Sequence, residues 1–428
     1  MQQRPNYQPD GLSRRQFIQT SAAGMAAALA AKNVIFAASA RRKFRVGLLG
    51  CGGRGTGALA NFVDALKVVD VDMELVATAD WFKSKAEDTG KKYNVPAERC
   101  FGGGDAYKKL LEANPDIVLM ATPPNFRPTH FEAVVKAGKH VFMEKPVAVD
   151  PPGARRIMAA GDMAKDKGLS VVAGTQRRHE AGYLRTQYAL SQGAIGTIVG
   201  GCIRWCGGAL WFKNRAPNER DADYMIRNWV SFSEMSGDHI VEQHVHNIDI
   251  ANWYLGHPPT SAMGFGGRAR RKTGDQFDFF SVDFDYGNGC HIHSMCRQID
   301  GTDGDVHEFF KGTEGETLGG GGLKGKTIAG IPQFPDRDPY VQEHVDWLKS
   351  IIDGKPLNEA RTVATSTLTG IMGRISAYTG KLVQWRQVAE DATSPYYNLT
   401  VKPTAQDFET GSVVAPPDNV APVPGKAA

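Results

Sequence analysis

The sequence predicts an α/β protein in which a doubly wound parallel sheet precedes an α+β domain with an open, mostly antiparallel sheet. Two observations carry this prediction. Apolar strand patterns alternate with helical patterns over residues 44–148, which is typical of a parallel sheet with crossover helices. From residue 198 onward, apolar and polar side chains alternate between Gly and Asn turns, which is typical of antiparallel strands with one covered face.

Length and composition are those of a globular protein of two ordinary domains. The chain has 428 residues, of which 42% are hydrophobic and 22% are charged, and both fractions are ordinary. The formal net charge of +4 is small and the arginines are scattered, so we expect no nucleic-acid partner. Six cysteines without a C-x-x-C motif argue against a disulfide scaffold and a thiolate zinc site, and predict free, buried cysteines.

The first forty residues are predicted to be an export signal. Residues 13–18 carry a twin arginine followed by an apolar pair, residues 22–31 form a short Ala-rich run, and residues 38–40 have a small-x-small cleavage pattern. The run is too short for a membrane span. The segment resembles a twin-arginine (Tat) signal, which predicts export of the folded protein to the periplasm through the Tat machinery.

An apolar strand over residues 44–49 runs directly into a glycine-rich turn that matches G-x-G-x-x-G, and a helix is predicted from residue 56 to 66. In this arrangement one glycine makes the tight turn, one lets a pyrophosphate approach the backbone, and one lets the helix pack on the strand. The helix N-terminus supplies free N–H groups for the phosphates. The predicted dinucleotide-binding residues of this turn are Gly50, Gly52, Gly53, Arg54 and Gly55.

The next strand, over residues 73–79, ends at Asp80. A carboxylate there can accept hydrogen bonds from a ribose 2′-OH and repels a 2′-phosphate, which favours NAD. Lys83 and Lys85 lie close by, so NADP stays open as an alternative. Asp80 could instead cap the following helix.

Two further strands, over residues 115–121 and 139–142, end in polar residues. Open α/β sheets bind ligands at the C-terminal ends of their strands. An ammonium at such a strand end is costly to desolvate and needs a partner, and the proline after it makes a rigid exit. The residues expected to meet the cofactor at these ends are Thr122, Pro123, Asn125, Glu144 and Lys145.

The glycine-rich turn, Thr122-Pro123-Pro124 and Glu144-Lys145-Pro146 together resemble the glucose–fructose oxidoreductase / inositol dehydrogenase / rhizopine catabolism (Gfo/Idh/MocA) family, over residues 44–385 or so. The resemblance implies that Lys145 is catalytic and lies next to the nicotinamide. It implies that Gln176 and Arg178 border the active site, although a solvated turn is the alternative for both. It also implies a homo-oligomer that forms through the second-domain sheet.

Residues 237–253 are predicted to form one helix, with Glu242, His246 and Asp249 on a shared face. Similarity to the family's catalytic helix implies that His246 transfers the proton and that Glu242 is its acidic neighbour. The best-known dehydrogenases of the family have aspartate in place of Glu242. A carboxylate beside the imidazole would orient the ring and raise its basicity. His239, Glu242 and His246 could alternatively hold a metal, but we expect none.

Four residues are predicted to contact substrate: Arg178, Trp229, His244 and Asp249. Trp229 follows an aromatic, Gly-rich stretch over residues 205–227 that is expected to be a long functional loop. His244 either binds substrate or only makes a hydrogen bond. The predicted organisation is a signal at 1–40, a Rossmann domain at 41–148, a substrate and oligomerisation domain at 149–387, and an extended, Pro-rich tail at 388–428 that wraps or stays loose.

The predicted activity is hydride transfer between NAD and a secondary alcohol of a sugar, glycoside or cyclitol. Because free NAD is scarce outside the cytoplasm, the cofactor is expected to stay tightly bound. One alternative is an NAD-dependent glycosidase that oxidises C3 transiently, eliminates the aglycone and reduces the sugar again. A second alternative is a sugar-binding protein without catalytic activity.

Overall fold

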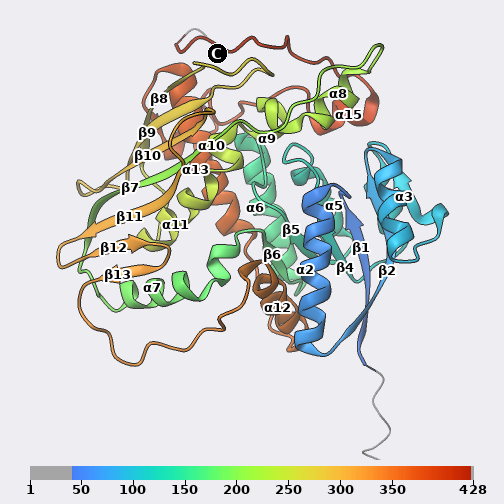
Figure 1. The fold of residues 1–428 in the computed structure, drawn as a ribbon, viewed down its shortest axis with the longest axis horizontal. Coiled ribbons are helices and arrows are strands. Elements are labelled where there is room, and N and C mark those ends of the chain that lie inside the picture. Colours follow the sequence, from blue (N-terminus) through green and yellow to red (C-terminus); the bar gives the residue numbers. More distant parts are fainter. Residues whose placement is uncertain (1–40, 426–428) are drawn as a thin grey trace, which may run out of the picture. The chain divides into compact units, whose positions relative to one another are not determined.

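The computed structural model describes residues 41–425, and the chain from Lys43 onward forms one compact unit. The export signal predicted at residues 1–40 lies outside the described residues. Within the unit, a parallel sheet covered by helices and a larger, mostly antiparallel sheet confirm the predicted fold class (Figure 1). None of the helices in residues 41–425 is both long and apolar enough to cross a membrane.

The first sheet has six strands in the order β3-β2-β1-β4-β5-β6, and every pairing is parallel. Its strands are near-continuous apolar runs because helices cover both faces of the sheet. Strand β6 extends this sheet past the predicted boundary at residue 148. The elements are β1 (Lys43–Leu49), α2 (Gly53–Val69), β2 (Asp72–Asp80), α3 (Lys83–Lys92), η1 (Ala97–Arg99), β3 (Cys100–Gly102), α4 (Ala106–Glu112), β4 (Ile117–Met120), α5 (Arg127–Lys136), β5 (His140–Met143), α6 (Pro151–Asp166) and β6 (Val171–Ala173).

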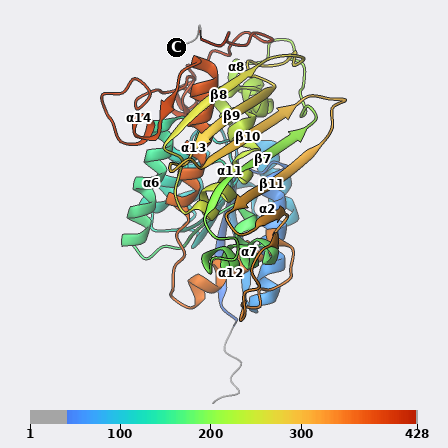
Figure 2. The same cartoon turned by 90° about the vertical axis from the view of Figure 1, so that its left-hand side faces the viewer.

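The second sheet has eight strands in the order β13-β12-β11-β7-β10-β9-β8-β14. All neighbours are antiparallel except β7 and β10, which run parallel. Helices lie against one face, and the other face is turned toward the viewer in Figure 2. The strands are β7 (Ile198–Gly207), β8 (Ser261–Gly267), β9 (Phe279–Asp285), β10 (His291–Gln298), β11 (Asp305–Gly312), β12 (Glu316–Gly319), β13 (Gly322–Lys324) and β14 (Val383–Gln384).

Two long helices lie near the C-terminus, and the second of them contacts strands of both sheets. Helix α12 (Pro339–Ile352) packs on α2, and α13 (Ala360–Thr379) packs between α6 and β8. The remaining elements are η2 (Gln176–His179), α7 (Ala181–Ser191), α8 (Asp221–Arg227), η3 (Trp229–Ser231), α9 (Ser233–Ser236), α10 (His239–Glu242), α11 (Val245–Leu255), α14 (Trp385–Ala389) and α15 (Ala405–Thr410).

Two segments differ from their predicted form, and a third takes one of the two forms predicted for it. The expected loop over residues 205–227 begins as the end of β7 and ends as helix α8. The single helix expected over residues 237–253 is divided into α10 and α11. The C-terminal tail wraps over the protein: its Val401 N–H donates to the Asp150 carboxylate at 3.1 Å, and its Gly425 N–H donates to the Tyr378 carbonyl at 2.9 Å.

The six cysteines are all free, as predicted. Four are buried, whereas Cys202 and Cys206 on β7 are only partly buried. In the part of the chain that the structure describes, no group of three His, Cys, Asp or Glu side chains is placed to hold a metal ion.

Candidate active site

The glycine-rich turn between β1 and α2 has the shape that its sequence predicts. Gly50 has φ of +95° and its N–H donates to the Ala79 carbonyl at 2.7 Å. A Cβ on Gly55 would stand 1.8 Å from the Gly50 carbonyl oxygen, so only glycine fits there. A Cβ on Gly52 would meet nothing within 4 Å, and no side chain caps the start of α2. The turn therefore leaves free N–H groups and open space for a pyrophosphate.

Asp80 at the end of β2 accepts backbone hydrogen bonds from both sides of the strand end. Its Oδ2 accepts from the Cys51 N–H at 2.8 Å and its Oδ1 from the Phe82 N–H at 2.9 Å. The N-cap of α3 is Phe82, so the alternative role of Asp80 as that cap is wrong. The carboxylate thus fixes the glycine-rich turn against β2 and still has lone pairs for a ribose hydroxyl.

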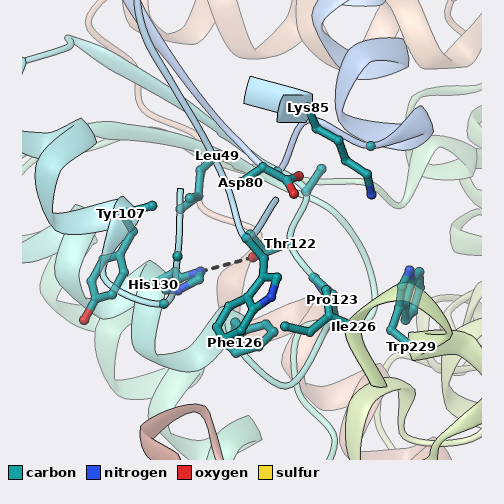
Figure 3. Close-up of a pocket in the computed structure, with 17 residues that line it drawn as sticks. Leu49, Asp80, Lys85, Tyr107, Thr122, Pro123, Phe126, His130, Ile226 and Trp229 are labelled. Carbon is teal, nitrogen blue, oxygen red and sulfur yellow. Dashed lines mark hydrogen bonds between the residues drawn. The ribbon is translucent and has the colours of Figure 1, made fainter. Parts of the chain in front are cut away.

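A pocket opens beside Asp80 (Figure 3). We call it the Asp80 pocket, and its lining combines apolar side chains with a few polar groups, as small-molecule sites do. Thr122 and Pro123 line it, and the Thr122 hydroxyl shares a 3.1 Å hydrogen bond with His130 Nδ1. Burial lowers the pKa of His130 to about 3. The full lining is Leu49, Gly50, Gly52, Asp80, Trp81, Lys85, Gly103, Gly104, Ala106, Tyr107, Ala121, Thr122, Pro123, Phe126, His130, Ile226 and Trp229.

The structure places Asn125 and Trp229 in surroundings that the sequence did not predict. The Asn125 amide donates to the carbonyls of Glu234 at 2.7 Å and Pro403 at 2.9 Å. It is therefore turned away from the Asp80 pocket and joins three chain segments instead. Trp229, predicted to contact substrate, lies in the wall of the Asp80 pocket (Figure 3).

Glu144, at the end of β5, pairs with the arginine of the glycine-rich turn. Arg54 Nε lies 2.8 Å from Glu144 Oε1, and only 4% of the Glu144 side chain is exposed. The Arg54 guanidinium lies over the Tyr340 ring at 5.1 Å, and the Gln176 amide donates to the Tyr340 hydroxyl at 3.1 Å. The predicted residues Arg54, Glu144 and Gln176 thus lie together through Tyr340, which the sequence analysis missed because it comes from α12.

Lys145 has the partner that its buried position requires. Its Nζ donates to the Glu242 carbonyl at 2.7 Å and to Glu242 Oε1 at 3.1 Å. The same contact explains the break between α10 and α11. In a continuous helix the Glu242 carbonyl would accept from the His246 N–H, but that N–H points to the Gln243 carbonyl at 3.4 Å. The Lys145 ammonium donates to the Glu242 carbonyl in place of the helical N–H.

His246 begins α11 beside this ion pair, and we call Lys145, Glu242 and His246 the Lys145 cluster. The imidazole stacks on Trp205 with ring centroids 5.6 Å apart. Neither of its ring nitrogens has a hydrogen-bond partner among residues 41–425. Burial, with the positive charges of Lys145 and Arg177, holds the pKa of His246 well below its ordinary value. His246 is therefore neutral, and a neutral imidazole can accept a proton.

The predicted effect of Glu242 on His246 is wrong. The Glu242 carboxylate is bound by Lys145, and no hydrogen bond or ion pair within residues 41–425 joins it to His246. Basicity is therefore lowered rather than raised, because burial and two cations oppose a charged imidazolium.

The other predicted substrate residues are held inside the protein. Arg178 and Asp249 form a two-pronged ion pair, with Nε–Oδ2 at 2.7 Å, and the Ser366 hydroxyl donates to Asp249 at 2.7 Å. His244 is fully buried and its Nε2 lies 2.7 Å from the Ser294 hydroxyl. We correct His244 and Asp249 to structural residues, because neither side chain has surface left for a substrate.

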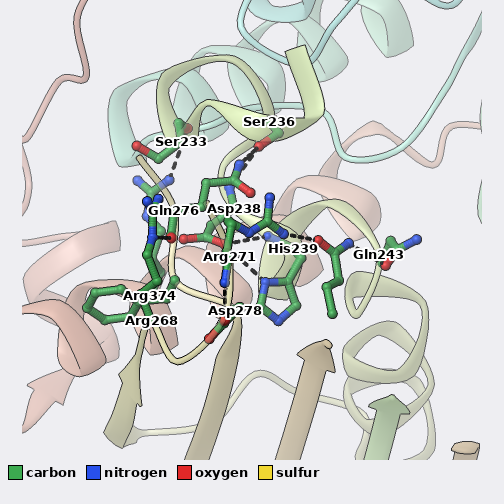
Figure 4. Close-up of polar contacts among 12 residues, drawn as sticks. Ser233, Ser236, Asp238, His239, Gln243, Arg268, Arg271, Gln276, Asp278 and Arg374 are labelled. Carbon is green, nitrogen blue, oxygen red and sulfur yellow. Dashed lines mark hydrogen bonds and ion pairs between the residues drawn. The ribbon is translucent and has the colours of Figure 1, made fainter. Parts of the chain in front are cut away.

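A buried polar network supports the start of α10 (Figure 4). Asp238 has φ of +75°, is fully buried, and accepts from the His239 N–H at 2.7 Å and from the Tyr378 hydroxyl. His239 Nδ1 lies 3.2 Å from Asp238, so His239 belongs to this network and not to the Lys145 cluster. Farther along, the Gln298 amide donates to Gln243 at 2.8 Å, which holds the residue between the two helices.

Comparisons with known proteins agree with this geometry. Residues 44–175 match the family described as "Oxidoreductase family, NAD-binding Rossmann fold", and residues 183–316 match the "GFO/IDH/MocA C-terminal domain". The fold and site thus define a two-domain, NAD-binding oxidoreductase of the Rossmann class. Because the two matches together span more than half of the chain, the protein belongs to the Gfo/Idh/MocA family, as the sequence motifs predicted.

Curated relatives include inositol 2-dehydrogenase of Rhizobium meliloti, which is 28% identical over 56% of this chain and 63% of its own length. The enzyme of that name from Ralstonia nicotianae is 30% identical over 51% of this chain and 56% of its length. The chain thus spans less than two thirds of these relatives. The scyllo-inositol 2-dehydrogenase (NAD(+)) of Bacillus subtilis is 24% identical over 73% of this chain and 87% of its length.

Solved structures share the fold. An oxidoreductase from Thermotoga maritima gives a TM-score of 0.64 at 21% identity, covering 81% of this chain and 100% of its own. A levoglucosan dehydrogenase in complex with NADH and levoglucosan gives 0.62 at 17% identity, covering 80% and 99%.

Proposed function

We propose that the protein transfers a hydride between NAD and a secondary alcohol of a sugar or cyclitol. The observation that carries this proposal is the Lys145 cluster, which joins a lysine at the end of β5 to a neutral histidine of the second domain. A cofactor site fits beside it: the glycine-rich turn is open at Gly52, and the Asp80 pocket continues from the turn.

The chain's own residues supply the acid–base chemistry of this reaction. During oxidation, neutral His246 accepts the hydroxyl proton on a ring nitrogen that has no protein partner. The Lys145 ammonium has three donors, of which two go to Glu242, and the third can hydrogen-bond the substrate oxygen as negative charge develops. NAD, when bound, supplies the hydride acceptor. The cofactor would be held by Arg54 from the glycine-rich turn, by Glu144 after β5 and by Gln176 after β6.

The substrate class rests on two supports. Curated relatives of the chain are named inositol 2-dehydrogenase and scyllo-inositol 2-dehydrogenase (NAD(+)). Near His246 the structure offers an aromatic ring, Trp205, with the Arg177 guanidinium 5.8 Å from its centroid. An aromatic face next to fixed charges suits the C–H faces and hydroxyls of a polyol ring.

Location and assembly are part of the same proposal. The twin-arginine motif at residues 13–18 supports export through the Tat machinery. The outer face of the second sheet and its edge expose large apolar side chains, including Phe265 at 65% and Leu318 at 53% exposure. Exposed apolar faces of this kind favour association, so we propose a homo-oligomer that forms through this sheet.

The test is an absorbance scan of purified protein that lacks residues 1–40, before and after addition of NAD and a panel of inositols, monosaccharides and aryl glycosides. A lasting rise of the reduced-nicotinamide band is expected. Release of aglycone without a lasting rise would replace the proposal with the redox-cycled glycosidase. If the protein binds no NAD and changes no sugar, it is a sugar-binding or scaffold protein instead.

A further inference from the structure

The wall of the Asp80 pocket is not made by the first domain alone. Ile226 at the end of α8 and Trp229 in η3 line the pocket opposite Asp80 and Lys85 (Figure 3). Trp229 is backed by Trp211, with ring centroids 6.1 Å apart in an edge-to-face arrangement. The second domain therefore reaches across the first-domain strand ends and covers the pocket from the side.

The C-terminal strap, defined here as residues 400–425, lies behind this wall. A separate hydrophobic cluster joins residues of the first domain, of α8–α9 and of the strap. At its centre is Phe408 of α15, which is only 2% exposed. Its ring packs edge-on against Trp81 at 5.8 Å and Phe126 at 5.0 Å, and both of these residues line the pocket.

Polar contacts fasten the strap to the first domain. Glu409 accepts from the Tyr107 hydroxyl at 3.0 Å and pairs with Lys108 at 2.7 Å. The Pro403 carbonyl accepts from the Asn125 amide at 2.9 Å. These contacts hold α15 against the side of the pocket that the first domain builds.

A second set of contacts fastens the strap to α8. The Ala415 N–H donates to Asp221 Oδ2 at 2.7 Å, and the Tyr224 hydroxyl donates to Asp418. On the other side of α8, Trp81 Nε1 donates to Asp223 at 2.7 Å. Helix α8 is therefore held between the end of β2 and the strap, and cannot move from the pocket unless these contacts break.

We propose that the C-terminal strap locks Ile226 and Trp229 over the adenosine half of NAD, so that the dinucleotide stays bound between turnovers. This inference rests on the proposed function, because it needs NAD in the Asp80 pocket. Trp229 is in this account a cofactor-binding residue rather than the substrate residue that its sequence position suggested. Release of NAD then requires the apolar cluster around Phe408 to open, which exposes buried aromatic surface to water.

The test compares NADH release from the full chain and from three strap variants. Phe408→Ala removes the centre of the cluster, Asp418→Asn weakens the hold on α8, and Val414→Ala is the control because Val414 lies in the strap with 76% of its surface exposed. Dissociation is followed by energy transfer from tryptophan to NADH after dilution into excess NAD. Folding is checked by the melting temperature without nucleotide.

We expect NADH to leave at least about ten times faster from Phe408→Ala and a few times faster from Asp418→Asn, with Val414→Ala unchanged. If Phe408→Ala does not fold, Asp418→Asn and Trp229→Ala carry the test. Equal dissociation rates in folded variants overturn the strap inference and leave the proposed function standing. A wild-type protein that binds no NADH overturns both.

Discussion

Around the Asp80 pocket the carboxylate, hydroxyl and imidazole groups are already paired with protein atoms, whereas at the Lys145 cluster hydrogen-bonding capacity is left over. Asp80, His130 and Tyr107 all have partners within the chain. His246 has none among residues 41–425, and Lys145 has a donor to spare. A region that must hold a ligand can be built from satisfied groups and packing, but a region that must move a proton needs groups whose partner arrives with the substrate.

The largest effect, a loss of catalytic rate, is expected when the groups with unused hydrogen-bonding capacity at the Lys145 cluster are removed. His246→Ala and Lys145→Ala should lower kcat by about 10²–10⁴-fold, because each removes a positioned proton-transfer or hydrogen-bonding group. NADH affinity should change little in His246→Ala, since the Asp80 pocket is intact. Steady-state kinetics with the best substrate of the panel and NADH titration measure the two effects, and Lys349→Ala, an exposed lysine of α12, is the control. Full activity in His246→Ala would remove it from the reaction.

The next effect concerns the glycine-rich turn that leads into the Asp80 pocket. Gly55→Ala should abolish tight NADH binding and lower the free energy of unfolding by at least ~2 kcal/mol, because its Cβ would meet a backbone oxygen at 1.8 Å. Gly57→Ala in the same helix meets only the Arg54 side chain at 3.7 Å. It should raise the free energy of unfolding by about 0.5–1 kcal/mol. Urea denaturation measures the free energies of unfolding of the two variants. Equal values for Gly55→Ala and Gly57→Ala would contradict the prediction.

The smallest effects are on pH dependence: of stability through His130 at the Asp80 pocket, and of rate through His246 at the Lys145 cluster. The pKa of buried His130 is about 3, against an ordinary 6.5. Between these values the unfolded chain binds a proton that the folded chain does not, so stability is lost as pH falls below 6.5. His130→Phe should therefore reduce this loss by up to ~1.4 kcal/mol per pH unit. Urea denaturation at several pH values between 6.5 and 5 measures the slope, and a slope equal to the wild-type slope would show that His130 is protonated in the folded state.

The same reasoning applies to the rate at the Lys145 cluster. Because the pKa of His246 is also lowered, kcat should show no loss of activity centred near pH 6.5 while the protein stays folded. A histidine with an ordinary pKa would instead lose its base form in that range.

Sequence patterns correctly predicted those parts of the molecule whose structure is set by residues nearby in the sequence. The strand, glycine turn and helix from Lys43 to Val69 follow from apolar runs and backbone demands within one segment. Asp80, Thr122 and Pro123 were likewise placed at the strand ends from their sequence positions, and all three line the Asp80 pocket.

The errors arose where a distant residue decides the outcome. The break between α10 and α11 depends on Lys145, which lies 97 residues from Glu242 in the sequence. The role of Asn125 depends on Pro403, 278 residues away. Tyr340 was missed, and the place of Trp229 in the wall of the Asp80 pocket was not predicted, because nothing near them in the sequence shows which domain they meet. A carboxylate four residues before a histidine also looks the same whether it pairs with that histidine or with a lysine elsewhere.

The cluster around Phe408 also fixes an order of events during synthesis. The glycine turn and the strand ends of the first domain leave the ribosome early, and Ala405, Phe408 and Val413 follow roughly three hundred residues later, since chains are made from the N-terminus. Until then the wall that Ile226 and Trp229 form beside Asp80 has no backing from the strap. On the strap proposal, a nucleotide bound before that moment is released faster, and firm retention begins only once the strap has been translated and folded.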